Sequence, residues 1–220
     1  VLLLVMDMLT IMESNCRKFG IEATFLNLPE LKSLIPEISD DIVGSVFFPN
    51  AGHSNPQRAV QAYGWACQDH GGKIYQGTAV TGISLSGGKV RGVNTTSGMI
   101  PADIVVCAAG PQTSLVGDTI GLHIPVAPGR VEIIATMPLE SRFKTYLSAN
   151  GLYGRQTLRG NLVFGGGPHE WIDVHLTQTP PKPNTPLIRN LSRRLAELLP
   201  GFQDLRLLRS WSGIVEQTPD

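Results

Sequence analysis

The sequence predicts a mixed α/β (α+β) fold, and three observations support this prediction. Apolar residues recur at helical spacing in several segments that stop at glycine or proline. Alternating runs separated by residues 86–88 and by residues 97–98 predict a three-stranded meander. A later set of more polar runs predicts an antiparallel sheet. Helices and strands therefore mix without a regular repeat, which is typical of this class.

The first fifty residues predict two helices and two strands. Residues 8–19 carry apolar side chains at helical spacing, and Gly20 stops the helix. Residues 21–27 are typical of a strand, and Pro29 then opens a short helix. The run 43–48 predicts the second strand.

The best-defined helix start lies at Asn55-Pro56. The asparagine side chain can accept from the first free amides, and proline at the first helical position has no amide to leave unpaired. The helix is expected to run to His70 with an apolar stripe of Val60, Tyr63 and Cys67. A short strand at 73–76 and the meander, with strands at 79–85 and 89–96, follow.

Residues 99–110 are the stretch around which the chain is organised. Their middle, residues 104–107, is a continuous apolar run rich in β-branched residues, which predicts a strand buried on both faces. It ends in Ala108, Ala109 and Gly110, whose side chains are too small to keep a ligand from the backbone. Ligands of open α/β sheets bind beyond the carboxyl ends of strands, so this end is a candidate site for a flat or phosphorylated ligand. The alternative is that the small residues let a helix pack tightly.

From about Leu122 the chain changes to antiparallel strands, which predicts a second domain. Strands are expected at 130–136, 144–149, 152–156 and 161–165. The run 165–167 is interpreted as a loop with room for a neighbouring ring. Thr185-Pro186 predicts the start of a helix with one apolar face, and residues 205–216 close the chain as strand.

Composition excludes several classes of protein. The 18 Lys and Arg balance 18 Asp and Glu, so no basic surface for nucleic acid or an anionic membrane is expected. The three cysteines are widely spaced in apolar context, which argues against a disulfide framework and favours a reducing, cytoplasmic compartment. The run 2–6 is too short for a membrane span and has no basic residues before it. The abrupt ends at Val1 and Asp220 predict a piece of a longer protein.

The sequence carries no motif typical of a metal site. The five histidines lack mutual ligand spacing, and no glycine-rich dinucleotide fingerprint or phosphate-loop motif is present. His169 is the histidine of most interest, because it follows the glycine run 165–167, where an imidazole could face a bound substrate. The alternative is a surface or capping histidine.

Three groups of residues resemble the D-amino-acid oxidase superfamily of FAD-dependent oxidoreductases. The glycines and apolar residues spaced through 77–110 are similar to its flavin-binding middle. The segment 209–214, which leads to Thr218-Pro219-Asp220, resembles the part that enters the flavin site in amine-oxidising members. Tyr153 with Gln156, and the glycines at 160, 165 and 166, resemble strands of the substrate domain. Within the superfamily the likeness is greatest to the β subunit of heterotetrameric sarcosine oxidase and to opine and proline dehydrogenase subunits.

The resemblance implies an enzyme that oxidises the C–N bond of a small amine or amino acid, of sarcosine, opine, proline or glycine type, to an imine. FAD would do the redox chemistry, and the protein would orient the reactants. Residues 1–49 and 122–212 would belong to the substrate domain, and residues 50–121 and 213–220 to an FAD-binding domain, incomplete at both ends. Partner subunits of a hetero-oligomeric dehydrogenase are implied, and this piece alone is expected to be inactive.

The resemblance also assigns candidate site residues. Val80 matches the position whose backbone meets the adenine, Ala108 to Gly110 line the nucleotide, and Gly213 lies near the flavin ring. Tyr153 and His169 are the catalytic candidates, expected to touch the substrate.

The sequence departs from the family pattern at three points. Val215 stands where amino-acid-oxidising members usually place an arginine, so Arg155, Arg130 or an arginine outside this chain would have to bind a carboxylate. Gln57 stands where sarcosine oxidase β subunits attach a second flavin, although His53 is close. The amino-terminal glycine-rich fingerprint, the main anion site for FAD, is missing. The alternative function is a non-catalytic subunit or binding module that keeps the flavoprotein fold.

Overall fold

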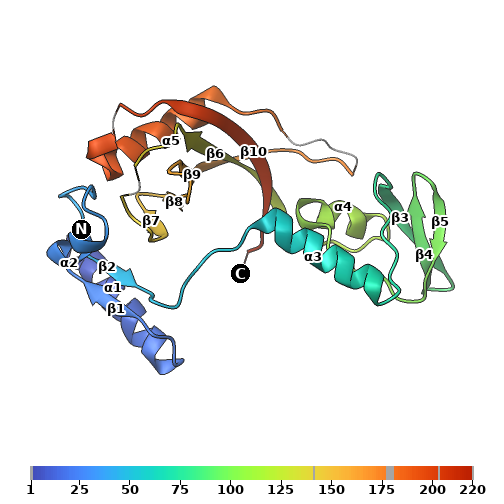
Figure 1. Cartoon of the computed structure of the whole chain (residues 1–220). Coiled ribbons are helices and arrows are strands. Elements are labelled where there is room, and N and C mark those ends of the chain that lie inside the picture. Colours follow the sequence, from blue (N-terminus) through green and yellow to red (C-terminus); the bar gives the residue numbers. More distant parts are fainter. Residues whose placement is uncertain (1, 141, 177–180, 203, 220) are drawn as a thin grey trace. The chain divides into compact units, whose positions relative to one another are not determined.

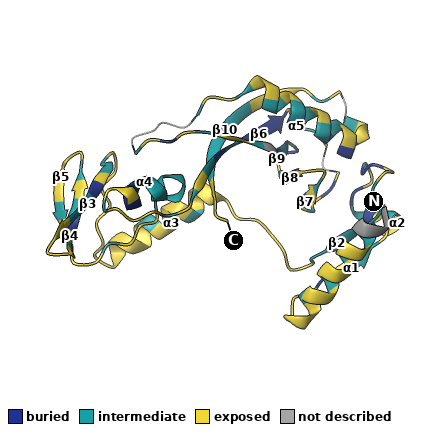
Figure 2. Cartoon of the chain, turned by 180° about the vertical axis from the view of Figure 1, so that it is seen from behind, coloured by how far each residue is buried: buried dark blue, intermediate teal, exposed yellow. Residues whose placement is uncertain are grey.

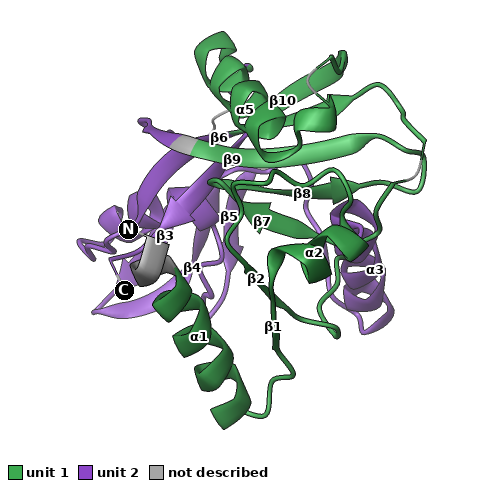
Figure 3. Ribbon diagram, turned by 90° about the vertical axis from the view of Figure 1, so that its left-hand side faces the viewer, with its two compact units in different colours: residues 1–53, 132–168, 183–211 green, residues 54–131, 169–182, 212–220 purple. Residues whose placement is uncertain are grey.

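The computed structural model describes residues 2–140, 142–176, 181–202 and 204–219. The chain divides into two compact units, shown in Figure 3. Unit 1 holds residues 1–53, 132–168 and 183–211, and unit 2 holds residues 54–131, 169–182 and 212–220. Three strands therefore begin in one unit and end in the other. The assignment of either unit to FAD or substrate stays a prediction.

Unit 1 begins with two helices and a two-stranded sheet (Figure 1). The elements are α1 (Leu2–Lys18), β1 (Thr24–Leu26), α2 (Leu28–Leu34) and β2 (Ser45–Phe47). Helix α2 starts with a capping box, because the Asn27 side chain accepts from the Glu30 amide while the Glu30 carboxylate accepts from the Asn27 amide. The two predicted helices and two predicted strands are confirmed in this region.

A five-stranded sheet has the strand order β10-β6-β9-β8-β7. Its strands are β6 (Ala127–Thr136), β7 (Leu147–Ala149), β8 (Leu152–Gln156), β9 (Leu162–Trp171) and β10 (Leu207–Gln217). Helix α5 (Thr185–Leu198) follows β9 and precedes the short 3-10 helix η2 (Pro200–Phe202). Leu152, Leu162 and Phe164 of the sheet share a buried cluster with Leu191 and Leu195 of α5. One face of the β8–β9 hairpin is thus the core of unit 1.

Unit 2 contains the meander and three helical segments. They are α3 (Pro56–Asp69), β3 (Val80–Ser86), β4 (Lys89–Thr95), β5 (Gly98–Pro101), the 3-10 helix η1 (Gly110–Gln112) and α4 (Thr113–Asp118). The meander is antiparallel throughout, in the order β3-β4-β5. Asn55 caps α3 as predicted, with its side-chain oxygen accepting from the Arg58 amide at 3.1 Å.

The predicted buried strand at residues 104–107 is wrong. The meander ends at Pro101, and the residues after it form no strand. Ile104 is 83% exposed and Val106 is 85% exposed. A strand needs a neighbour to satisfy its backbone, and no described strand pairs with this run, so its apolar composition alone does not bury it.

Four further expectations are corrected. Residues 73–76 form no strand, and Val60 and Tyr63 of the α3 stripe are exposed, so Figure 2 shows that helix largely in the colour of exposed residues. The run 165–167 is not a loop, because β9 continues through it to Trp171. Helix α5 is capped by Asn184, one residue before the predicted cap, through a bond from the Leu187 amide. None of the described helices combines the length and hydrophobicity that a membrane span requires.

Candidate functional site

Tyr153 lies on the face of the β8–β9 hairpin that does not face the core. Its neighbours Leu152 and Gly154 are buried, whereas Tyr153 is 37% exposed. Its cross-strand partner is Gly165, and a Cβ placed on that glycine would lie 3.0 Å from Cε2 of the Tyr153 ring. The ring therefore lies across Gly165, as aromatic side chains do when they cover a strand glycine. We call this side of the hairpin the open face; it carries Ser148, Tyr153, Arg155 and Gly165.

Tyr146 is a second tyrosine at this site, and sequence reasoning missed it. It precedes β7, whose Leu147 and Ser148 pair with Gly154 and Tyr153. Burial, and after it the phenolate charge of Tyr153, raise the pKa of Tyr146 above its usual value, and burial also raises the pKa of Tyr153. Both phenols are therefore protonated at neutral pH and can donate hydrogen bonds. The signal that could have found Tyr146 is its alternation with the buried Leu147.

Gln156, the other β8 residue that carried the resemblance, has a structural role. Its side chain points to the core side of the strand and is buried. Its amide oxygen accepts from the Arg142 amide at 2.7 Å, and its amide nitrogen donates to the carbonyls of Glu140 and Gly160 at 2.8 and 3.0 Å. These bonds attach the segment before β7 and the turn after β8 to the strand that carries Tyr153.

In unit 2 the predicted nucleotide-lining residues are partly accessible. Ala108 is exposed, and Ala109 and Gly110 are half-buried. Gly110 has φ +54° and starts η1, a conformation that favours glycine. A Cβ on Gly110 would lie 3.5 Å from the Glu216 Oε2 atom, so this loop adjoins the end of β10. Glu216 is a neighbour that the sequence did not predict.

Gly213 and Val80 complete the predicted cofactor residues. Among the described residues, a Cβ on Gly213 would meet only Val131, at an ordinary contact distance of 3.8 Å, so packing against these residues does not require glycine there. Val80 begins β3 and pairs with Thr95. Small side chains and exposed backbone at 108–110, together with free space at Gly213, fit close approach by a large flat ligand. These residues stay predictions as FAD contacts.

His169 lies beside a cleft of unit 2. Its Nδ1 atom is 2.9 Å from Nε2 of Gln217, and its ring is edge-on to Trp171 with centroids 6.5 Å apart. With the Gln217 amide donating to Nδ1, the neutral ring carries its proton on Nε2. Gln217 and Trp171 line a cleft of about 370 Å³ with residues 125–127 and 218–219. Tyr153 belongs to unit 1 and His169 to unit 2.

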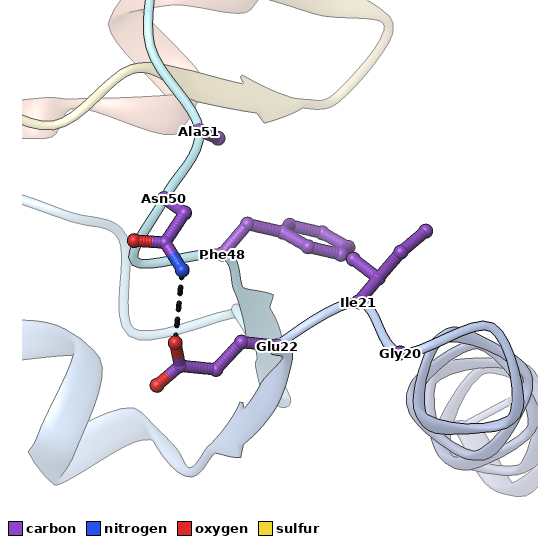
Figure 4. A pocket seen from close by; sticks show the side chains of 6 residues that line it. All are labelled: Gly20, Ile21, Glu22, Phe48, Asn50 and Ala51. Atoms are coloured by element: carbon purple, nitrogen blue, oxygen red, sulfur yellow. Dashed lines mark hydrogen bonds between the residues drawn. The ribbon is translucent and has the colours of Figure 1, made fainter.

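Unit 1 has a pocket of its own, of about 330 Å³, which no sequence pattern indicated (Figure 4). The Asn50 amide donates to a Glu22 carboxylate oxygen at 2.9 Å, while Phe48 and Ile21 supply apolar surface. Within the described residues no group of three or more His, Cys, Asp and Glu side chains could hold a metal ion.

Comparison with known proteins identifies a family. A model of the family described as "DAO: FAD dependent oxidoreductase" matches residues 3–220. Sarcosine oxidase subunit beta of an Arthrobacter species is 29% identical over 91% of this chain and 50% of its own length. The corresponding subunit of Rhodobacter capsulatus is 25% identical over 91% of this chain and 49% of its own length.

Solved structures of amino-acid dehydrogenases and oxidases share the fold of this chain. The structure of L-proline dehydrogenase from P. horikoshii superposes with a TM-score of 0.82 at 25% identity, over 93% of this chain and 55% of that one. Glycine oxidase from Geobacillus kaustophilus gives a TM-score of 0.84 at 24% identity, over 97% and 56%, and shares the fold. The chain spans about half the length of the curated relatives it matches.

Proposed function

Because the chain belongs to the family of FAD-dependent oxidoreductases, we propose that it is part of an enzyme that oxidises the C–N bond of a small amine or amino acid to an imine. The observation that carries this proposal is the family match over residues 3–220 together with the relatives' names, which include sarcosine oxidase subunits and glycine oxidase. In the bound state FAD supplies the acceptor for the hydride equivalent. The residues of this chain bind the substrate and FAD and orient them toward each other.

On the substrate side, the open face of unit 1 supplies hydrogen-bond donors. The raised pKa values of Tyr146 and Tyr153 keep both phenols protonated, so either can donate to a substrate oxygen. Tyr153 is held over Gly165, which restricts its ring to one side of the strand. A ring fixed in this way costs little further entropy when it contacts a ligand.

On the cofactor side, unit 2 supplies accessible backbone. We assign Ala108, Ala109, Gly110 and Gly213 to FAD contacts, because their small or absent side chains leave room at the main chain. Val80 joins this assignment through the family resemblance alone. His169 is assigned to the substrate, since Gln217 fixes its ring beside the cleft and leaves Nε2–H free to donate.

Partner subunits belong to the proposal as well. Several relatives are named as subunits, among them sarcosine oxidase subunit beta and hydrogen cyanide synthase subunit HcnC. We infer that the full protein assembles with other subunits in the cytoplasm. A non-catalytic module that keeps the fold is the alternative.

The first test is the visible spectrum of the full-length protein, followed by acid precipitation. We expect flavin absorbance and release of FAD into solution. Colour that stays in the pellet would indicate covalent attachment, with His53 the first residue to replace. A colourless protein would contradict the proposal and favour the non-catalytic module.

The site assignment has its own test, Gly110→Trp. An indole at this position would occupy the space assigned to the nucleotide, so we expect the variant to lose FAD while its far-ultraviolet circular dichroism is unchanged. Gly110→Ala is the matched control, because it carries the same backbone cost at φ +54° without the indole. FAD at wild-type stoichiometry in Gly110→Trp would remove residues 108–110 from the cofactor site.

A further inference from the structure

Helix α1 of unit 1 carries apolar side chains on two of its sides. Leu9 and Cys16 are half-buried, about two turns apart, and the helix contacts β1 and β2. A second set of apolar side chains, which we call the α1 stripe, is exposed to solvent, and Figure 2 draws most of this helix in the colour of exposed residues. The stripe consists of Met8 (63% exposed), Ile11 (58%), Met12 (46%) and Phe19 (82%), which directly follows the last turn. An exposed apolar patch with a polar rim is typical of a protein–protein contact.

The α1 stripe occupies one sector of the helix. Successive residues turn by about 100°, so Met8, Ile11 and Met12 fall within about 100° of the circumference. Phe19 is about three turns from Met8 and lies along nearly the same line. The stripe thus runs along most of α1 and has the width of a helix face that packs against another element.

Two opposite charges border the stripe on the same flank. Asp7 and Lys18 are also about three turns apart, so one lies near each end of the stripe on one side of the helix. Neither forms an ion pair within the described part of the chain, although the Lys18 ammonium lies 3.5 Å from the Asn15 amide oxygen. Glu13 and Arg17, by contrast, pair with each other at 2.7 Å on another side of α1. The flank is therefore negative at its amino-terminal end and positive at its carboxyl-terminal end.

This arrangement of apolar and charged groups is self-complementary. A two-fold axis beside residues 12 and 13 would place α1 antiparallel to α1 of a second copy, so that each Met12 meets the other and each Met8 meets a Phe19. The same axis brings Asp7 of each copy opposite Lys18 of the other, which forms two equivalent ion pairs. We propose that the α1 stripe is an interface between two copies of this chain. The proposal goes beyond the proposed function, because the contact requires neither flavin nor another kind of subunit.

The first test is the mass of the full-length protein in solution, measured without other subunits by sedimentation equilibrium over a range of concentrations. Because the stripe is small, we expect a dimer with a Kd in the micromolar range. Met12→Glu places two carboxylates beside the axis and should weaken the dimer at least about 10-fold. Leu158→Glu is the matched control, because Leu158 is a fully exposed residue of unit 1 outside the stripe, and it should dimerise like the wild type.

Three outcomes of this measurement would overturn the proposal. They are a wild type that stays monomeric throughout, a dimer that Met12→Glu does not weaken, and equal weakening by Met12→Glu and Leu158→Glu. The flavin content of the same samples separates this proposal from the proposed function. A colourless dimer that Met12→Glu weakens would support the interface and contradict the proposed function, whereas a flavin-containing monomer would overturn the interface alone.

A charge exchange tests whether the partner is a second copy in this orientation. Asp7→Lys and Lys18→Asp each replace both ion pairs of the dimer by like-charge pairs, so each variant alone should dimerise about 10-fold more weakly than the wild type. A heterodimer of the two variants regains two opposite-charge pairs, because the reversed position of one copy faces the reversed position of the other. It should therefore form with nearly wild-type affinity.

The affinity of the heterodimer is measured by titrating fluorescently labelled Asp7→Lys with unlabelled Lys18→Asp. Lys144→Asp replaces Lys18→Asp in the matched control, because Lys144 is an exposed lysine of unit 1 outside α1 and its replacement changes the net charge equally. This control heterodimer keeps one like-charge pair, so it should be weaker. Equal affinity of labelled Asp7→Lys for Lys18→Asp and for Lys144→Asp would overturn the proposal.

Discussion

Residues 162–164 in the β8–β9 hairpin of unit 1 and residues 104–107 of unit 2 are both short apolar runs, but their surroundings are opposite. The hairpin buries Leu152, Leu162 and Phe164 to 1% exposure or less against helix α5 and presents Tyr153 on its other face. Residues 102–109 contain an equally apolar run, yet Ile104 and Val106 are largely exposed. Burying apolar side chains is favourable, but a segment becomes a buried strand only where a neighbouring strand pairs with its backbone and a helix covers its apolar face.

The largest expected effect tests the buried side of that comparison. Leu162 is 0% exposed, and Leu162→Ala removes its contacts while leaving a cavity, which should lower the free energy of unfolding by about 2–5 kcal/mol. Leu158→Ala is the matched control in the same hairpin, because Leu158 is fully exposed and should change stability by at most about 0.5 kcal/mol. Urea denaturation measures both. Equal costs would show that Leu162 is not buried in solution.

The next prediction concerns the open face. Gly165→Ala places a methyl group 3.0 Å from the Tyr153 ring and 3.1 Å from the Ile133 side chain, so the ring must move. We expect a loss of about 1–3 kcal/mol in unfolding free energy, typical of overpacking, and a changed turnover. The control is Gly52→Ala, because the added methyl group meets nothing within 4 Å there. Gly167 is unsuitable as a control, since its φ of +84° strains any other residue. Wild-type stability of Gly165→Ala would mean that the ring does not lie on this glycine.

Tyr153→Phe separates function from folding on the same face. The phenol is partly exposed and protonated, and no described residue bonds its hydroxyl, so its loss should cost at most about 0.5 kcal/mol of stability. As a donor to substrate it should matter more, with kcat/KM lowered about 10-fold. Steady-state kinetics give kcat/KM, and urea denaturation of the same preparation gives the free energy of unfolding. An unchanged kcat/KM with every substrate of the wild type would remove Tyr153 from the site.

Local signals explain what the sequence could predict. The bounds of β8, the meander turns and the Asn55 cap depend on residues within one turn or one hairpin, and all were predictable. The continuation of β9 through residues 165–167 depends on a neighbouring strand, so a glycine run that suggested a loop became strand. Glu216 enters its site through a loop contact that no short motif encodes. The alternation of Tyr146 with Leu147 indicates a face of the chain, but the pairing of β7 with β8 is needed to show which site that face joins.

The smallest expected effect tests the exposed side of the comparison. In the 220-residue chain, Ile104→Ala should change the free energy of unfolding by at most about 0.5 kcal/mol, because the side chain is 83% exposed and has little burial to lose. Ile134→Ala, at a position that is 0% exposed, is the matched substitution and should cost about 2–5 kcal/mol. A cost above about 2 kcal/mol at Ile104 would break the comparison, since the apolar run would then be buried in solution. Repeating both substitutions in the full-length protein sharpens it: a cost that rises at Ile104 but not at Ile134 would show that further chain covers this run.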